Sequence, residues 1–173
     1  CSIARGERDD EKAAKILGNA FTLLLAASVI LMVLAWCLMD QALRLFGAME
    51  DSIGYAREYL GIYIAGTPFV MVSLGLNGYI SVQGFARRGM MTVLLGAVTN
   101  IVLDPVFMFV FHMGVAGAAV ATVLSQAVSA AWCLSFLRGK HASLELSRRT
   151  MRLERPLVAG ILSLGITNFI MNL

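Results

Sequence analysis

The stretch GMMTVLLGAVTNIVLDPVFMFVFHMGVAGAAVATVLSQAVSAAWCLSFL, residues 89–137, contains a single Asp, Glu, Lys or Arg, which is Asp104. Residues 16–39, 59–86 and 156–173 contain none, over 24, 28 and 18 residues. A helix needs ~20 apolar residues to cross the hydrocarbon core of a bilayer. The charge pattern therefore predicts an all-α membrane protein built as a bundle of transmembrane helices.

The overall composition supports this prediction. Hydrophobic residues make up 58% of the 173 residues, and charged residues 14%, where ~25% is usual in soluble domains. Disorder, a soluble enzyme fold and nucleic-acid binding are therefore excluded as leading interpretations. We expect no enzyme, because both histidines lie outside the spans and cannot pair with a serine there. We also expect no cofactor, since no cofactor-attachment or phosphate-binding motif occurs.

Four complete spans and the start of a fifth are predicted. The complete spans lie at about 13–38, 58–83, 90–111 and 115–137, and the fifth begins at Pro156. The segment between Asp40 and Glu58 mixes charges with large apolar residues, so we expect it to lie on the bilayer surface.

Basic residues predict the orientation. The loops 2–15, 84–89 and 138–155 hold 12 of the 14 Lys and Arg residues, whereas the two loops on the other side hold two. Because cytoplasmic loops carry an excess of Lys and Arg, we expect a multi-pass protein of the cell (inner) membrane with these three loops in the cytoplasm. The chain opens at Cys1 and stops within an apolar run, so we expect it to be a fragment of a longer protein.

Asp104 is the first candidate for a functional site. An aspartate at the centre of a span costs ~2.5–3.5 kcal/mol on insertion scales and usually marks an ion or proton path. Asn100 lies one helical turn earlier on the same face, and Pro105 leaves the carbonyl of Ile101 without its helical donor. These oxygens suit Na⁺ or a proton. Alternatively, Asp104 is the N-cap of a new helix that begins at Pro105, which would make 90–103 a separate segment.

The fourth span adds small and polar residues. Gly117, Ala121 and Ser125 recur every four residues and predict a face for close helix contact. Thr122 and Gln126 lie on an adjacent face. The Thr122 hydroxyl either bonds within its own helix or faces Asp104. In the second span, Asn77 either lines a cavity with Gln126 or bonds a neighbouring helix.

The quoted residues resemble a known family. The stretch 96–126, with its Asn-x-x-x-Asp-Pro and Met-Gly-Val-x-Gly-Ala-Ala motifs, closely resembles the fifth and sixth helices of the multidrug and toxic-compound extrusion (MATE) family. Residues 2–20 resemble the segment between its second and third helices, 67–91 its fourth helix, and 162–172 its seventh. Within the family, the chain looks most like the bacterial drug exporters.

The resemblance implies a twelve-helix transporter with two lobes, which exports organic, often cationic, compounds in exchange for Na⁺ or H⁺. Residues 1–137 would be part of the amino-terminal lobe (helices three to six), 138–155 a cytoplasmic linker, and 156–173 the start of the second lobe. Family cation sites place an asparagine, an aspartate and a threonine at positions that Asn100, Asp104 and Thr122 match. The first-helix aspartate of such sites is absent from this sequence.

The resemblance is incomplete in the fifth span, where relatives usually have a proline and this chain has Gly165-Ile166-Thr167-Asn168. The expected partners are the lipid bilayer, small amphipathic or cationic substrates and the remainder of the chain. The first rival is a lipid-linked saccharide flippase of the same superfamily, which would need basic residues along its cavity. A non-transporting scaffold or remnant is the second.

Overall fold

The computed structural model describes residues 10–45, 50–139 and 155–171, and every element in these ranges is helical. The elements are, in chain order, α2 (Asp10–Leu45), α3 (Glu50–Ala65), α4 (Thr67–Val82), α5 (Ala86–Pro105), the π-helical η1 (Val106–Val110), α6 (Gly114–Arg138) and α7 (Arg155–Met171). The predicted all-α fold is confirmed for these residues. Most of the predicted loops 2–15 and 138–155 lies outside them.

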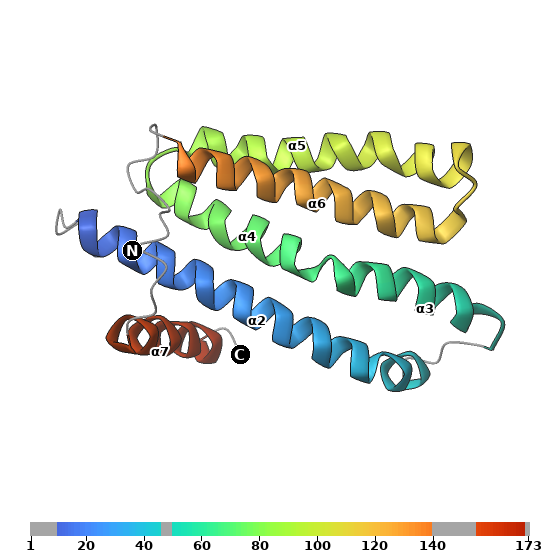
Figure 1. Ribbon diagram of the computed structural model, residues 1–173, viewed down its shortest axis with the longest axis horizontal. Coiled ribbons are helices and arrows are strands. Elements are labelled where there is room, and N and C mark those ends of the chain that lie inside the picture. The colour runs from blue at the N-terminus through green and yellow to red at the C-terminus, as the bar shows by residue number, and fades with distance from the viewer. Residues whose placement is uncertain (1–9, 46–49, 140–154, 172–173) are drawn as a thin grey trace.

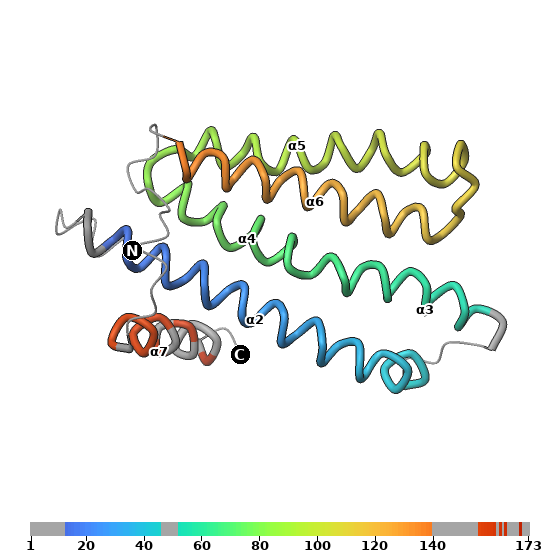
Figure 2. The backbone as a smooth tube through the Cα atoms, viewed as in Figure 1, coloured from blue at the N-terminus to red at the C-terminus, as the bar shows by residue number. Residues whose placement is uncertain are grey.

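The long helices lie side by side along one axis (Figure 1). Helices α5 and α6 form a hairpin, and the pair α3–α4 lies between this hairpin and α2. The backbone path in Figure 2 runs back and forth along this axis, and α7 contacts α2. Helix α6 is central to the packing, since it contacts α3, α4, α5 and η1.

Three helical stretches are each long and apolar enough to cross a membrane: Ala13–Leu45, Ala86–Val110 and Gly114–Arg138. The pair Ser52–Ala65 and Thr67–Val82 forms a fourth span if its two bent halves count as one. The prediction of about four complete spans therefore agrees with the structure. Helix α7 has 17 described residues, somewhat short of the ~20 needed to cross a bilayer.

The second predicted span, 58–83, is wrong as one straight helix. It begins earlier, at Glu50, and bends by 49° between α3 and α4. Pro68 explains the break, since it has no N–H to donate and its ring would clash with the carbonyl four residues back. The bend also lets Gly66 approach α6, because a Cβ at Gly66 would overlap a methyl group of Val123.

The segment between Asp40 and Glu58, which is predicted to lie on the bilayer surface, is helical on both sides of residues 46–49, which lie outside the described ranges. Helix α2 continues through Asp40 to Leu45, and α3 already includes Glu58. Asp40 and Arg57 form an exposed ion pair, with 3.2 Å between the carboxylate Oδ2 and the guanidinium Nη2. The ion pair therefore joins α2 to α3, and the surface position of this segment stays a prediction.

The apolar core lies toward the end of the bundle where the chain turns from α4 into α5. Leu17 on α2, Leu76 and Ile80 on α4, and Leu137 on α6 are each 0% exposed and belong to one packed cluster. The cluster holds α2, α4 and α6 together. None of its fully buried members comes from α5.

Asp104 is not a helix N-cap. Helix α5 continues through Asp104 and Pro105 into η1, and no side-chain cap bond is formed at that junction. The alternative with 90–103 as a separate segment is therefore wrong. A π-turn fits this position, because proline removes one helical hydrogen bond and the chain takes up the extra residue beside it.

The α5–α6 hairpin closes where the sequence predicts. His112 and Gly114 both have φ of 54°, a left-handed conformation that glycine adopts freely and histidine more often than most residues. Gly117 then lies against η1, where a Cβ would be 2.8 Å from the carbonyl carbon of Phe107 and 3.0 Å from the amide nitrogen of Met108. The predicted close contact of the small-residue face is present, with Gly117, Ala121 and Ser125 all buried.

Candidate functional site

Asp104 lies near one end of its span and not at its centre. Eighteen residues separate it from Ala86, and six from Val110; at 1.5 Å per residue these correspond to about 27 Å and about 9 Å. The side chain is half-buried. Asp104 is therefore closer to the hairpin at Phe111–Met113 than to the basic turn at Arg87 and Arg88.

The three residues of the predicted cation site are in contact. The Asn100 amide Nδ2 donates to Asp104 Oδ1 at 3.2 Å and lies 3.5 Å from Thr122 Oγ1. Asn100 and Asp104 come from successive turns of α5, and Thr122 comes from α6. The hairpin places Thr122 beside them, although it is 22 residues away from Asn100 in the sequence.

Of the two alternatives for Thr122, the bond within its own helix is present, and across the hairpin Thr122 contacts Asn100 and not Asp104 directly. Its hydroxyl donates to the Ala118 carbonyl within α6 at 2.9 Å, as Thr residues inside helices commonly do. Its oxygen retains lone pairs and accepts from Asn100. The bond within α6 fixes the rotamer, so that the oxygen is held toward α5.

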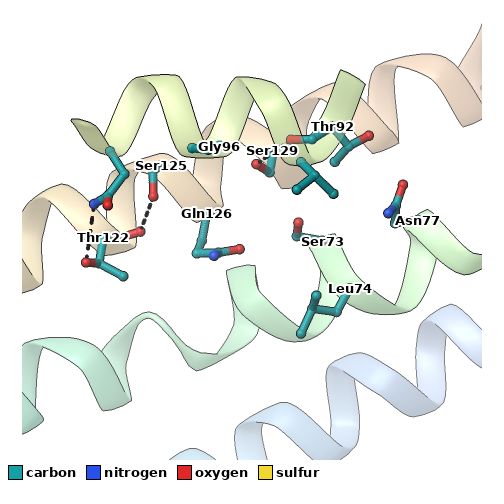
Figure 3. Close-up of a pocket in the computed structure, with 12 residues that line it drawn as sticks. Ser73, Leu74, Asn77, Thr92, Gly96, Thr122, Ser125, Gln126 and Ser129 are labelled. Carbon is teal, nitrogen blue, oxygen red and sulfur yellow. Dashed lines mark hydrogen bonds between the residues drawn. The ribbon is translucent and has the colours of Figure 1, made fainter. Parts of the chain in front are cut away.

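A cavity of about 280 Å³ extends from this triad along the seam between α4, α5 and α6. Figure 3 shows Ser73 and Asn77 of α4 across from Thr122, Ser125, Gln126 and Ser129 of α6. The complete lining is Ser73, Leu74, Asn77, Thr92, Val93, Gly96, Ala97, Asn100, Thr122, Ser125, Gln126 and Ser129. It contains no charged side chain. Asp104 does not line the cavity itself, but it is hydrogen-bonded to Asn100, which does.

The structure places both predicted lining residues, Asn77 and Gln126, on the cavity wall. The Asn77 Oδ1 atom is buried and has no hydrogen-bond partner. A buried amide oxygen without a partner is costly in an apolar surrounding, and this one faces the first turn of α5, where a Cβ at Gly89 would lie 3.0 Å from it. Of the two alternatives for Asn77, the geometry favours the cavity.

Several lining residues were missed in the sequence. Ser125 and Ser129 lie on the same side of α6 as Thr122 and Gln126, at spacings of three, four and seven residues, which place residues on one helical face. Ser125 Oγ donates to the Thr122 carbonyl at 2.8 Å, and Ser129 Oγ donates across the seam to the Thr92 carbonyl at 3.2 Å. This hydroxyl pattern could have revealed the face. Ser73 on α4 gave no such signal.

The donor set suits a hard monovalent cation or a proton. It combines one carboxylate with an amide and a hydroxyl, which are oxygen ligands. In the described part of the chain, His, Cys, Asp and Glu side chains nowhere gather in groups of three. Asp104 is the only titratable residue of the three, and the other two, Asn100 and Thr122, are neutral.

The sequence matches the MatE family over residues 1–106. It is 25% identical over 166 residues to the multidrug export protein MepA of Staphylococcus haemolyticus. It is 34% identical over 126 residues to Protein DETOXIFICATION 42 of Arabidopsis thaliana. These alignments cover 96% and 70% of this chain but 37% and 24% of the relatives. The chain thus spans between 24% and 37% of the length of these two relatives.

Solved structures agree with the sequence match. A MATE crystal structure in the bent conformation superimposes with a TM-score of 0.89 at 30% identity, over 95% of this chain and 37% of the other. An inward-facing multidrug resistance MATE family transporter gives 0.88 at 29% identity, over 95% and 38%. The fold of the described residues is that of part of these transporters. Together with the family match over residues 1–106, these results show that the chain belongs to the MatE family.

Proposed function

We propose that this chain is part of a secondary multidrug exporter that couples the outward movement of organic, often cationic, compounds to the entry of Na⁺ or H⁺. The observation that carries the proposal is the contact of Asp104, Asn100 and Thr122 at the end of a polar, uncharged cavity. The names of relatives such as MepA, a multidrug export protein, support it.

Asp104 is the group that carries charge in this mechanism. A proton or Na⁺ that reaches the site neutralises the carboxylate, and this removes the cost of a charge held within a span. Asn100 now donates its Nδ2 to Asp104. To bind Na⁺, its amide turns so that Oδ1 faces the ion, and Thr122 Oγ1 supplies a third oxygen. Each loaded state changes the bonds between α5 and α6 and so favours one conformation of the hairpin.

The cavity supplies the binding surface for the exported compound. Its amides and hydroxyls form hydrogen bonds of many geometries, and its apolar residues, such as Leu74 and Val93, contact rings and alkyl groups. Such a mixed lining is typical of small-molecule sites. A lipid-linked saccharide flippase fits less well, because a diphosphate headgroup would require basic side chains, and the lining has none.

The place of the chain in the whole protein follows from the same proposal. Residues 1–137 belong to the amino-terminal lobe, 138–155 form the linker between the lobes, and 156–173 begin the second lobe. The protein lies in the inner membrane, with loops 2–15, 84–89 and 138–155 in the cytoplasm. A scaffold does not require a carboxylate inside a span, which makes it the weaker alternative, whereas a remnant would keep Asp104 without activity.

The decisive variant is Asp104→Asn in the full-length transporter. Asparagine has nearly the same shape and is cheaper to bury than a carboxylate, so we expect near-normal expression and loss of gradient-driven efflux. Transport of a fluorescent cationic dye by intact cells or everted membrane vesicles, under an imposed Na⁺ or H⁺ gradient, measures the loss of efflux. Wild-type efflux by the variant would remove Asp104 from the coupling mechanism.

A further inference from the structure

A second pocket lies at the opposite end of the α5–α6 hairpin from Asp104. It has a volume of about 210 Å³ and is lined by Arg88, Trp132, Ser135, Phe136 and Gly139. Four of these residues come from the last turns of α6 and the residue after it, and Arg88 comes from the first turn of α5. None of them belongs to the cavity described above, so the pocket has no role in the proposed coupling.

Arg88 is held in this pocket by aromatic rings. Its guanidinium carbon lies 5.9 Å from the ring centroid of Trp132 and 5.9 Å from that of Phe136. Phe136 is itself fixed by an edge-on contact with Phe85, whose ring centroid is 5.1 Å away. Cation–π contacts hold the guanidinium group but leave its N–H donors unused. The positive group is therefore pre-positioned without being neutralised.

The charge around the pocket favours an anion. Arg87 and Arg88 lie in the first turn of α5, which contains no acidic residue, and Arg138 lies in the last turn of α6. The amino terminus of a helix carries a partial positive charge, so basic residues there are unfavourable. In the described part of the chain, Arg88 has no ion pair. A bound anion would offset this accumulation of positive charge.

One of the residues that line the pocket also carries a buried donor without an acceptor. The indole Nε1 of Trp132 is buried and has no hydrogen-bond partner, whereas Trp N–H groups in proteins usually find one. The hydroxyl of Ser135 is a further donor on the rim. The guanidinium of Arg88, with the Ser135 hydroxyl beside it, matches the oxygens of a phosphodiester.

We propose that this pocket binds the headgroup phosphate of an anionic phospholipid. The location supports a lipid, since Arg and Trp at the end of a spanning helix lie at the depth of the headgroups. The apolar faces of the spans below the pocket would contact the acyl chains. Basic pockets between spanning helices are a known arrangement for anionic headgroups. The lipid would bridge the ends of α5 and α6.

The test uses the full-length protein, purified in neutral detergent, and short-chain phosphatidylglycerol against phosphatidylcholine with the same acyl chains. Native mass spectrometry gives the dissociation constant of each lipid. We expect tighter binding of phosphatidylglycerol, and a loss of at least about tenfold in Arg88→Gln, which is what one charge-assisted hydrogen bond typically contributes. Trp132→Leu removes one of the two rings that hold the Arg88 guanidinium and should weaken binding severalfold.

Arg87→Gln is the matched control, because it removes the same charge one residue away and Arg87 does not line the pocket. It should lose no more than about fivefold, from long-range attraction alone, and this loss should shrink in 0.5 M salt, which screens distant charges. Equal losses in Arg87→Gln and Arg88→Gln would overturn the proposal. So would equal binding of both lipids, or competition by inorganic phosphate at concentrations similar to the lipid.

Discussion

The apolar cluster and the polar seam between α4, α5 and α6 contain different kinds of side chain, although α6 contributes to both. In the cluster, large side chains such as Leu17, Leu76 and Leu137 are fully buried between α2, α4 and α6. Along the seam, α5 buries only Gly89 and Thr92, and hydroxyl bonds such as that from Ser129 to Thr92 join the helices. The apolar cluster is held together by the packing of large side chains, and the seam by a few hydrogen bonds that other partners could replace.

This difference indicates which part of the lobe can change. Separating α5 from α6 would expose small and polar groups, although these two helices make the most extensive contact of any described pair, whereas separating α2 from α4 would open the apolar cluster. In a bilayer, apolar side chains lose little free energy when they face lipid. The exposed apolar face of α5 therefore does not fix the position of this helix. We therefore expect the α5–α6 seam to respond to the state of Asp104 while the cluster stays fixed.

The largest contrast in stability and efflux should appear between two single variants, Asp104→Asn at the site and a truncation in the apolar cluster. Leu76→Ala removes a fully buried side chain, and such truncations cost about 2–5 kcal/mol. We expect a clear drop in the melting temperature of the full-length protein, while the remaining folded protein keeps gradient-driven efflux. Val82→Ala on the same helix is the control, because Val82 is 42% exposed and does not line the cavity. Loss of coupling without loss of stability in Leu76→Ala would break the comparison.

The contact between α6 and η1 gives a test of intermediate size. Gly117→Leu places four carbons where a single Cβ would already meet the backbone of Phe107, and overpacking typically costs about 1–3 kcal/mol. The melting temperature should fall, and efflux should fall with it, since the contact lies beside the Asp104 site. At Gly61 a Cβ meets nothing within 4 Å, so Gly61→Leu should be nearly neutral. An unchanged melting profile for Gly117→Leu would place that face toward lipid.

Removing the neutral ligands should have a smaller effect than removing the charge. Asn100→Ala and Thr122→Ala each delete one oxygen but leave Asp104 ionisable, so efflux should persist with a weaker dependence on the ion gradient. Thr99→Ala, a neighbouring change on α5 outside the cavity lining, should match wild type. The measurement is dye efflux against the size of the imposed gradient. If either ligand variant lost efflux as completely as Asp104→Asn, charge would not be the dominant element of the site.

The orientation of the protein in the membrane can be tested with a single cysteine that should not affect activity. The cluster lies at the end of the bundle with Arg87, Arg88 and Arg138, and the basic loops predict that this end faces the cytoplasm. A cysteine at Ser143 in a cysteine-free background should resist an impermeant thiol reagent added to intact cells, and react after permeabilisation. Rapid labelling from outside would reverse the orientation of both regions.

The sequence was sufficient for the fold class because lipid imposes a simple rule. A span must satisfy its backbone bonds internally and must lack charges, so the uncharged stretches between Lys15 and Asp40 and between Asp104 and Arg138 reveal helices directly. The same rule singled out Asp104, whose charge is an exception to it. Asn100 could be added because residues four apart share a helical face. The matched motif then assigned Thr122 to the same site.

Tertiary structure decided what depends on contacts between helices. Periodicity could not show the bend at Gly66, because Pro68 permits either a kink or a helix start, and the approach of Val123 belongs to another helix. It could not choose between the bonds of Thr122, since a hydroxyl can donate within its helix and accept across the hairpin at once. Nor could it place Asn77 and Ser73 opposite Ser129, because the packing of α4 against α6 depends on side-chain shape over the whole interface. Local chemistry is encoded residue by residue, whereas a cavity exists only where three helices fail to fill the space between them.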